Sequence, residues 1–364
     1  MINRQELIND FCEMVKIDSP SFQEKKMIEY CKNFLTKQGF EIKIIPFTYN
    51  GKTTSNIYAY KKGTLDGGII LGAHMDVVKP NIGINPQVKN GVIKSDGTTV
   101  LGGDDKIAVA AIFNAIKYIE KTNLEHRDIE LAITSAEEMG VVGARFFSSK
   151  DFKNKQGVIF DAGGKYGGIV TGAPSHDVYE ITIKGISSHA GISPEKGDNA
   201  ILKSAKVLQK LPSGRLNENT VANVGVIKGG KATNIVPDEV VINGEVRSFI
   251  TSEVDKKINE IKNILSETLK PEDYSFSVER EYECYEFPED NELVQTVAQN
   301  ISKTGITPYY FKTGGGSDAN AFNKNGLEIV NVSCGMMQPH SLDEYVEIED
   351  MVKVTELCVY LCTE

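Results

Sequence analysis

The sequence has no apolar run long enough to cross a bilayer. None of its apolar stretches approaches the roughly 20 residues that a membrane-spanning helix needs. The first ten residues lack the basic segment and apolar core of a secretory signal. We therefore expect a cytoplasmic protein with no membrane partner.

The sequence also lacks closely paired cysteines. Its six cysteines form no Cys-x-x-Cys motif and are too sparse for a disulfide scaffold. A zinc finger needs close pairs of ligands, so that class is excluded as well. We expect reduced thiols. Cys334 lies close to His340 and is a candidate catalytic thiol, but a buried structural thiol is the interpretation that we favour.

An excess of positive charge is missing too. There are 40 Lys and Arg residues against 50 Asp and Glu residues, which gives a formal net charge of -10. Proteins that bind nucleic acids neutralise phosphates with Lys and Arg, so we expect no nucleic-acid partner. The 364 residues, 40% of them hydrophobic, suffice for one large or two medium domains.

What the sequence does contain is a series of acid and histidine clusters beside short apolar runs. Four clusters follow such runs: His74 with Asp76, Glu137 with Glu138, Asp161, and His340. A fifth, Asp104-Asp105, follows two glycines and precedes a helix-like apolar run. The length and β-branching of the short runs indicate buried parallel strands. Because the carboxyl ends of parallel strands share one edge, we expect these side chains to form one polar pocket.

The order of the patterns predicts an α/β fold with an insertion. Residues 1–174 and 287–364 are expected to form a doubly wound, mixed but mostly parallel sheet with helices on both faces. Residues 175–286 change to a βαββαβ order, which is typical of a ferredoxin-like α+β domain and suggests an inserted lid or dimerisation domain.

Three local patterns give narrower expectations. Residues 21–24, Ser-Phe-Gln-Glu, have the pattern of a capping box that opens a second helix, closed at Gly39. Residues 142–147 are expected within a helix. Residues 77–97, rich in Pro, Gly and Asn, are expected to be an irregular connection or a small hairpin.

The five clusters suit a pair of zinc ions. A catalytic zinc has three protein ligands and an open position for water. Two ions fit if Asp104 bridges them, with His74 and Asp161 completing one site and Glu138 and His340 the other. The alternative for Asp104 and Asp105 is a helix N-terminus whose acids suit its dipole.

The remaining acids would support the chemistry. Asp76 is placed to hold the His74 imidazole by its far nitrogen, unless it is a solvated loop acid. Glu137 is placed to act as general base, taking a proton from water and giving it to a leaving amine. Two exposed glutamates at a helix start are the alternative for Glu137 and Glu138.

Together these motifs resemble the dinuclear zinc exopeptidases and deacylases, which include carboxypeptidase G, aminoacylase and succinyl-diaminopimelate desuccinylase. Gly-Ala-His-Met-Asp at 72–76, Leu-Gly-Gly-Asp-Asp-Lys at 101–106 and Thr-Ser-Ala-Glu-Glu at 134–138 are most similar to the peptidase T-like branch, which cleaves short peptides. The resemblance implies the same five ligands, Glu137 as general base and a cis peptide between Asp104 and Asp105.

The resemblance also implies substrate contacts. It assigns this role to His189, Asn234, Arg247, Gly315 and Ser317. For His189 a surface histidine is the alternative, for Arg247 a strand-face ion pair, and for the glycine-rich stretch around Gly315 a plain tight turn. The resemblance further suggests a homodimer formed through the inserted domain.

The expected activity is hydrolysis of the N-terminal peptide bond of a short peptide by a water that two zinc ions activate. A deacylase acting on N-acyl amino acids would use the same metal residues and stays open. A non-catalytic binding module is the third alternative.

Overall fold

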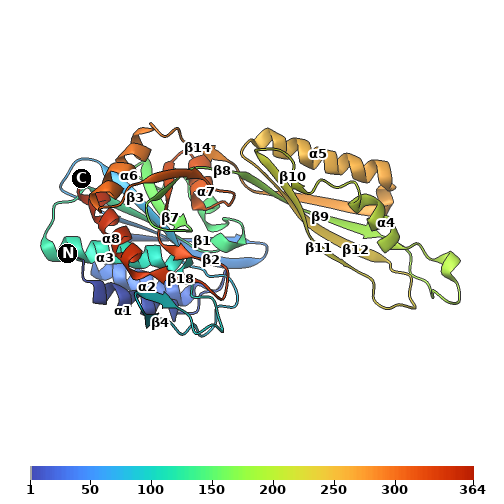
Figure 1. Cartoon of the computed structure of the whole chain (residues 1–364), viewed down its shortest axis with the longest axis horizontal. Coiled ribbons are helices and arrows are strands. Elements are labelled where there is room, and N and C mark those ends of the chain that lie inside the picture. The colour runs from blue at the N-terminus through green and yellow to red at the C-terminus, as the bar shows by residue number, and fades with distance from the viewer. Residues whose placement is uncertain (1) are drawn as a thin grey trace. The chain divides into compact units, whose positions relative to one another are not determined.

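The computed structural model describes residues 2–364 and divides the chain into two compact units (Figure 1). The first unit contains Met1–Gly172 and Glu286–Glu364, and the second contains Ala173–Tyr285. The second unit is therefore an insertion between two parts of the first. No helix within residues 2–364 is both long and apolar enough to cross a membrane.

A nine-stranded mixed sheet forms the middle of the first unit. Its order is β1-β2-β6-β3-β7-β16-β8-β14, with β15 beside β8. β3 runs parallel to β6 and β7, and β7 runs parallel to β16, whereas β1, β2 and β6 pair antiparallel. The strands are β1 (Glu41–Tyr49), β2 (Lys52–Lys61), β3 (Gly68–His74), β6 (Asp128–Thr134), β7 (Gln156–Ala162), β8 (Gly168–Ala173), β14 (Tyr285–Glu286), β15 (Tyr309–Lys312) and β16 (Glu328–Ser333).

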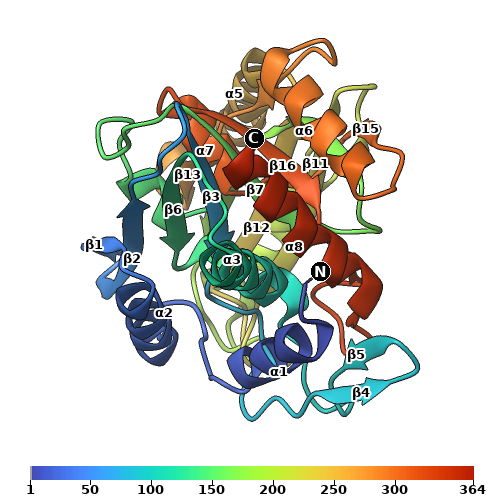
Figure 2. The same cartoon turned by 90° about the vertical axis from the view of Figure 1, so that its left-hand side faces the viewer.

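Helices cover both faces of this sheet, as the sequence predicts. α3 packs against β3, α1 and α8, and Figure 2 shows α3 and α8 side by side. On β2, Ile57 and Ala59 join the core around α3, whereas Tyr58 between them packs on Phe152. Phe152 also contacts Phe322 of α7, so α7 lies over the opposite face. The helices are α1 (Arg4–Val15), α2 (Lys25–Lys37), α3 (Gly103–Thr122), α6 (Glu292–Lys303), α7 (Asp318–Lys324) and α8 (Ile348–Thr363).

The expected capping box at the start of α2 is wrong. The helix begins at Lys25, its N-cap is Glu24, and that side chain makes no capping hydrogen bond. Ser21 Oγ instead donates to Asp76 Oδ2 at 2.7 Å, and Glu24 accepts the N–H of Ala136 at 3.0 Å. Ser21 is therefore bonded to a distant residue, and Glu24 combines a distant partner with the local N–H of Phe22, at 2.8 Å.

The helix expected over residues 142–147 is also wrong. Only a short 3₁₀ turn, η2 (Gly143–Phe146), forms there. Gly140 and Val141 both have positive φ, 91° and 58°, and Phe147 is extended at φ -89° and ψ 145°, so only a short turn fits between them. A Cβ at Gly143 would lie 2.1 Å from the carbonyl oxygen of Ser135, so the chain also packs too closely there for a side chain.

The segment 77–97 contains the small hairpin that was expected as one alternative. β4 (Gln87–Lys89) and β5 (Val92–Lys94) pair antiparallel around Asn90-Gly91, both with positive φ. The pair extends into a four-stranded sheet with β18 (Tyr345–Glu347) and β17 (Met336–Met337).

The second unit is a five-stranded antiparallel sheet in the order β10-β11-β12-β9-β13. The tyrosine and aliphatic side chains of one face pack on α4 and α5 in a separate core. The order β9-α4-β11-β12-α5-β13 matches the βαββαβ prediction, with the short β10 added. The elements are β9 (Ser175–Lys184), α4 (Ala200–Leu208), β10 (Gly214–Arg215), β11 (Thr220–Gly229), β12 (Glu239–Ser248), α5 (Thr251–Thr268) and β13 (Tyr274–Tyr282).

Candidate metal centre

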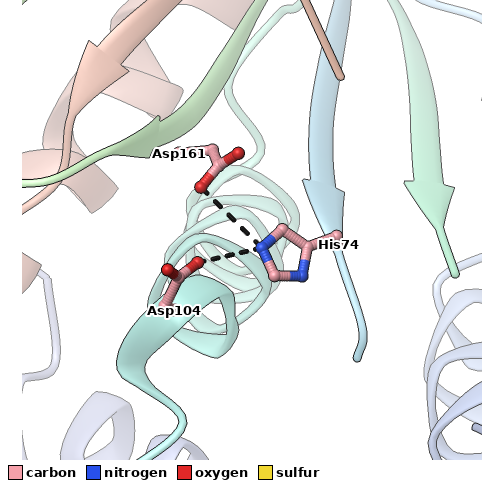
Figure 3. Close-up of side chains that lie close together, drawn as sticks. All are labelled: His74, Asp104 and Asp161. Atoms are coloured by element: carbon pink, nitrogen blue, oxygen red, sulfur yellow. Dashed lines mark hydrogen bonds and ion pairs between the residues drawn. The ribbon is translucent and has the colours of Figure 1, made fainter. Parts of the chain in front are cut away.

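The predicted ligands converge at one edge of the first unit's sheet. His74 ends β3 and Asp161 lies at the end of β7, and these two strands are parallel neighbours. Asp104 lies in the first turn of α3, and Figure 3 shows it below Asp161 and beside His74, with both carboxylates turned toward the imidazole. Glu138 follows β6 in the 3₁₀ turn η1 (Glu137–Met139), and His340 lies on the loop between β17 and β18.

The Asp104 carboxylate lies between two imidazoles. Its Oδ1 is 2.9 Å from His74 Nε2, and its Oδ2 is 3.2 Å from His340 Nε2. Asp161 Oδ1 lies 3.7 Å from His74 Nε2, and Glu138 Oε2 lies 3.0 Å from His340 Nε2. Asp104 is therefore shared by two clusters of three side chains.

Each cluster can hold one cation. In the group His74, Asp104 and Asp161, and again in the group Asp104, Glu138 and His340, one donor atom from each residue lies within 4.8 Å of the others. Imidazole nitrogen with carboxylate oxygen is a donor set that zinc accepts. The side chains of Asp104, Asp161 and Glu138 are only 11%, 10% and 6% exposed, and burying such charges is costly unless something pairs them. The donor chemistry and the burial both fit two divalent cations bridged by Asp104.

The charges in this cluster perturb one another strongly. Burial, together with the charge of Asp104, raises the pKa of Glu138 to about 7. Burial also raises the pKa of Asp161 to about 8, although a hydrogen bond from His74 opposes this. Hydrogen bonds to Asp104 and Glu138 raise the pKa of His340 to about 10. Bound cations would favour the ionised carboxylates that burial disfavours.

Comparison with known proteins identifies the family. A model described as the M20 peptidase dimerisation domain matches residues 172–273, and one described as peptidase family M28 matches residues 56–170. The Bacillus subtilis protein YqjE is 35% identical over 100% of this chain and 99% of its own. The crystal structure of aminopeptidase PepT from Bacillus cereus is 35% identical, with a TM-score of 0.86 over 100% of this chain and 98% of that one. A tripeptidase from Staphylococcus aureus is 30% identical, with a TM-score of 0.92 over the same shares.

The chain belongs to the M20 family of metallopeptidases. The family resemblance predicted from the motifs is confirmed, and with it the mixed sheet and the separate antiparallel domain. M20 and M28 peptidases depend on metal, and this M20 peptidase has a candidate metal site. The Asp104–Asp105 peptide is cis in the structure.

Asp76 holds the site in a different way from the one expected. His74 Nδ1 lies 3.0 Å from the backbone carbonyl oxygen of Asp76, whereas the nearest Asp76 carboxylate oxygen is 3.6 Å away. That carboxylate accepts the N–H groups of Glu137 at 2.9 Å and Glu138 at 3.2 Å, and the Ser21 hydroxyl. In this M20 peptidase the Asp76 side chain therefore fixes the Glu137-Glu138 turn, and its carbonyl orients His74.

A hollow of about 190 Å³ lies directly over the candidate ligands. Glu137 lines it beside Asp104, Glu138, Asp161 and His340, with Gly315 and Gly316 on another wall. Ser317, expected to face substrate, does not fit that role. It is 2% exposed, precedes α7 as its N-cap, and its Oγ accepts a hydrogen bond from Asn331. The hydroxyl is used to fix the start of the helix.

The other three substrate candidates belong to the second unit. His189 and Asn234 are exposed and lie on two loops that are joined, since the N–H of Ala190 donates to the carbonyl oxygen of Asn234 at 2.9 Å. Arg247 makes the ion pair that was the alternative interpretation: its Nη2 lies 3.0 Å from Glu245, and its Nη1 donates to the Tyr282 hydroxyl.

Cys334 is a structural thiol. It is fully buried, and burial raises the pKa of its thiol well above the ordinary value, as do the charges of nearby aspartates. A thiolate nucleophile is disfavoured there.

Sequence reasoning missed two residues that hold this site. Asn331 accepts the N–H of Asp161 at 2.9 Å, and Glu344 accepts three N–H groups around Asp104. A polar Asn inside the apolar strand 329–332 was an available signal for the first. Nothing in the local sequence marks Glu344.

Proposed function

We propose that this M20 peptidase is a zinc-dependent aminopeptidase that removes the N-terminal residue from short peptides such as tripeptides. The observation that carries the proposal is the Asp104 carboxylate lying between His74 and His340, with a third ligand available on each side. Similarity at 30–35% identity to an aminopeptidase and a tripeptidase supports the choice of substrate.

His74, Asp104 and Asp161 are proposed to hold one zinc ion, and Asp104, Glu138 and His340 the other. Two bound cations would polarise the peptide carbonyl and make a water molecule more acidic. All five side chains are supplied by the first unit, so the metal centre does not need the insertion for its ligands.

Glu137 is proposed as the general base. Its carboxylate lines the hollow beside the ligands, and its backbone is fixed by Asp76. In this role it accepts a proton from the attacking water and delivers it to the amine of the departing residue. A positioned acid–base group of this kind contributes about 10²–10⁴ in rate.

Substrate contacts are proposed for Gly315 on the wall of the hollow and for His189, Asn234 and Arg247 on the second unit. Glycine at 315 leaves room for a peptide backbone to approach, since a Cβ there would meet only Thr313, at 3.8 Å. The Arg247 guanidinium suits a carboxylate, although it would have to exchange its pairing with Glu245 to bind one.

We also propose a homodimer formed through the second unit. Within the described residues, β11 pairs along its length with β12 but with β10 only at Val221 and Ala222, so its later part presents an open edge. Val226 and Ile227 on that edge are 42% and 52% exposed, and Leu202 of α4 is 64% exposed. An open strand edge beside apolar side chains suits pairing with a second copy.

The test of function compares free and blocked tripeptides. The expected result is rapid hydrolysis of Leu-Gly-Gly at its first bond, loss of activity after chelation, and little turnover of the N-acetylated tripeptide or of N-acetyl amino acids. Two zinc ions per chain should be found by elemental analysis. Turnover of acylated substrates alone would instead indicate the deacylase.

A further inference from the structure

Glu344 is a buried acid that neither ligates a candidate cation nor lines the hollow. Its side chain is in contact with the loop that leads into α3 and is 1% exposed. Oε2 accepts the N–H groups of Leu101 at 2.7 Å and Gly102 at 2.9 Å, and Oε1 accepts the N–H of Asp104 at 3.0 Å. One carboxylate therefore satisfies three backbone N–H groups at and just before the shared ligand.

Glu344 and His340 lie on the same loop, between the paired strands β17 and β18. His340 contacts the Asp104 carboxylate at 3.2 Å, while Glu344 contacts the Asp104 amide. The loop thus holds Asp104 at both its side chain and its backbone. Because the His340 side chain is 55% exposed, packing fixes it weakly, and Glu344 is the buried anchor of the loop.

The absence of a side chain at Gly103 leaves room for this carboxylate. A Cβ at Gly103 would lie 2.9 Å from Glu344 Oε1 and 2.8 Å from Val346 Cγ2. Both distances are shorter than real Cβ contacts, so any side chain there would push Glu344 away from the amides. The glycine next to the shared ligand is therefore explained by Glu344.

We propose that Glu344 is a positioning residue that sets the location of the Asp104 carboxylate and ties it to His340, so that the site formed by Asp104, Glu138 and His340 depends on it. Its own oxygens are occupied by backbone N–H groups, so it acts through Asp104 and not as a ligand. The inference rests on the proposed metal centre.

The experiment measures zinc affinity at each of the two sites of the full-length protein by competition with a chelator. Glu344→Gln keeps one oxygen for Leu101 and Gly102 but turns an NH₂ group toward the N–H of Asp104. Loss of such a supporting contact typically weakens a metal site 10–100-fold. We expect the larger loss at the site completed by Glu138 and His340 and a smaller loss at the other site, because the two share Asp104, with kcat restored in part by excess zinc.

Gly103→Ala is the second variant, because it displaces the Glu344 carboxylate without removing its charge. It should likewise weaken the site completed by Glu138 and His340 more than the other site, and it tests the inference even if Glu344→Gln does not fold. Asp343→Asn is the matched control. Asp343 is an exposed acid on the same loop, so both zinc affinities should stay at the wild-type level.

Two results would overturn the inference: both variants binding two zinc ions with wild-type affinity, or both weakening the two sites equally in proportion to a lower melting temperature of the metal-free protein. The latter is what a merely structural role predicts. A wild-type protein that binds no zinc at all would refute the proposed function first, and this inference with it, so the two failures are distinguishable.

Discussion

Replacing Asp76 should separate the placement of Glu137 from the binding of metal. The Asp76 carboxylate is fully buried and accepts the N–H groups of Glu137 and Glu138, while His74 is held by the Asp76 backbone carbonyl. Asp76→Asn keeps that carbonyl and one side-chain oxygen but turns an NH₂ group toward one of the two amides. The perturbation therefore acts on the Glu137-Glu138 turn and leaves the bond from His74 in place.

The size of the effect follows from the unpaired amide. A buried N–H without an acceptor costs about 1–3 kcal/mol. In a domain of roughly 150–250 residues, each kcal/mol lowers the melting temperature by about 2–4 °C. The expected fall is therefore about 2–12 °C. A displacement of the Glu137 carboxylate by about 1 Å would reduce kcat about 100-fold, because catalysis depends on the distance between the catalytic group and the reacting atoms.

The assay compares kcat, zinc content and melting temperature in wild type, Asp76→Asn and Ser21→Ala. Ser21→Ala removes only the third donor to Asp76, so it should cost about 0.5–1.5 kcal/mol and change kcat by less than about threefold. Asp76→Asn should retain two zinc ions with the low kcat. If Asp76→Asn instead lost a zinc ion while its activity per bound zinc ion stayed normal, the result would show that the Asp76 carboxylate orients His74. A kcat within twofold of wild type would refute the role in placing Glu137.

Four further outcomes are expected. Glu137→Gln should keep two zinc ions and lose about 10²–10⁴ in kcat, which metal analysis and steady-state kinetics would check; a nearly normal kcat would remove Glu137 from its role. Chelation should abolish activity and lower the melting temperature, because cations that bind only the folded state stabilise it, and added zinc should restore both. Leu202→Glu should shift the protein from dimer to monomer in light scattering without unfolding it. An unchanged dimer would show that the interface lies elsewhere. Hydrogen bonds from His176 and then Arg247 lower the pKa of Glu245 from 4.5 to about 2, so its charge stabilises the folded second unit above pH 4.5 and this stabilisation is lost as the pH falls toward 2. The melting-temperature gap between wild type and Glu245→Gln should therefore be full at pH 6 and shrink on acidification; a gap independent of pH would contradict this.

The candidate metal ligands could be brought together from the sequence because each one leaves a mark in its own neighbourhood. His74 and Asp161 end apolar runs of strand length, and parallel strands bring their carboxyl ends together whatever the loops do. The same reasoning found Glu138, because the strand that precedes it, β6, lies beside β3. Periodicity, length and the residue that follows a strand are all local, so the site could be assembled from the sequence.

The residues that hold the ligands could not be predicted in the same way. Glu344 bonds to amides about 240 positions earlier in the chain, and an amide N–H gives no sign in the sequence of what accepts it. Ser21 and Glu24 even led to a wrong prediction, because Ser-x-x-Glu is a local capping pattern. In the structure Ser21 bonds to Asp76, and the buried Glu24 bonds to Ala136 as well as to the local Phe22, because buried polar groups need hydrogen-bond partners wherever these lie in the sequence.

The buried acids around this centre therefore divide into two kinds by what their oxygens face. Asp104, Asp161 and Glu138 have oxygens 2.9–3.7 Å from imidazole nitrogens and belong to the two clusters that can each hold a cation. Asp76 and Glu344 instead have both oxygens occupied by N–H donors, so neither can turn toward a cation without leaving amides unpaired in the interior. Counting every buried acid would therefore overstate the number of candidate ligands. The same division explains why the site keeps its shape: the ligands are carried on turns whose backbone is fixed by acids that do not compete for the metal.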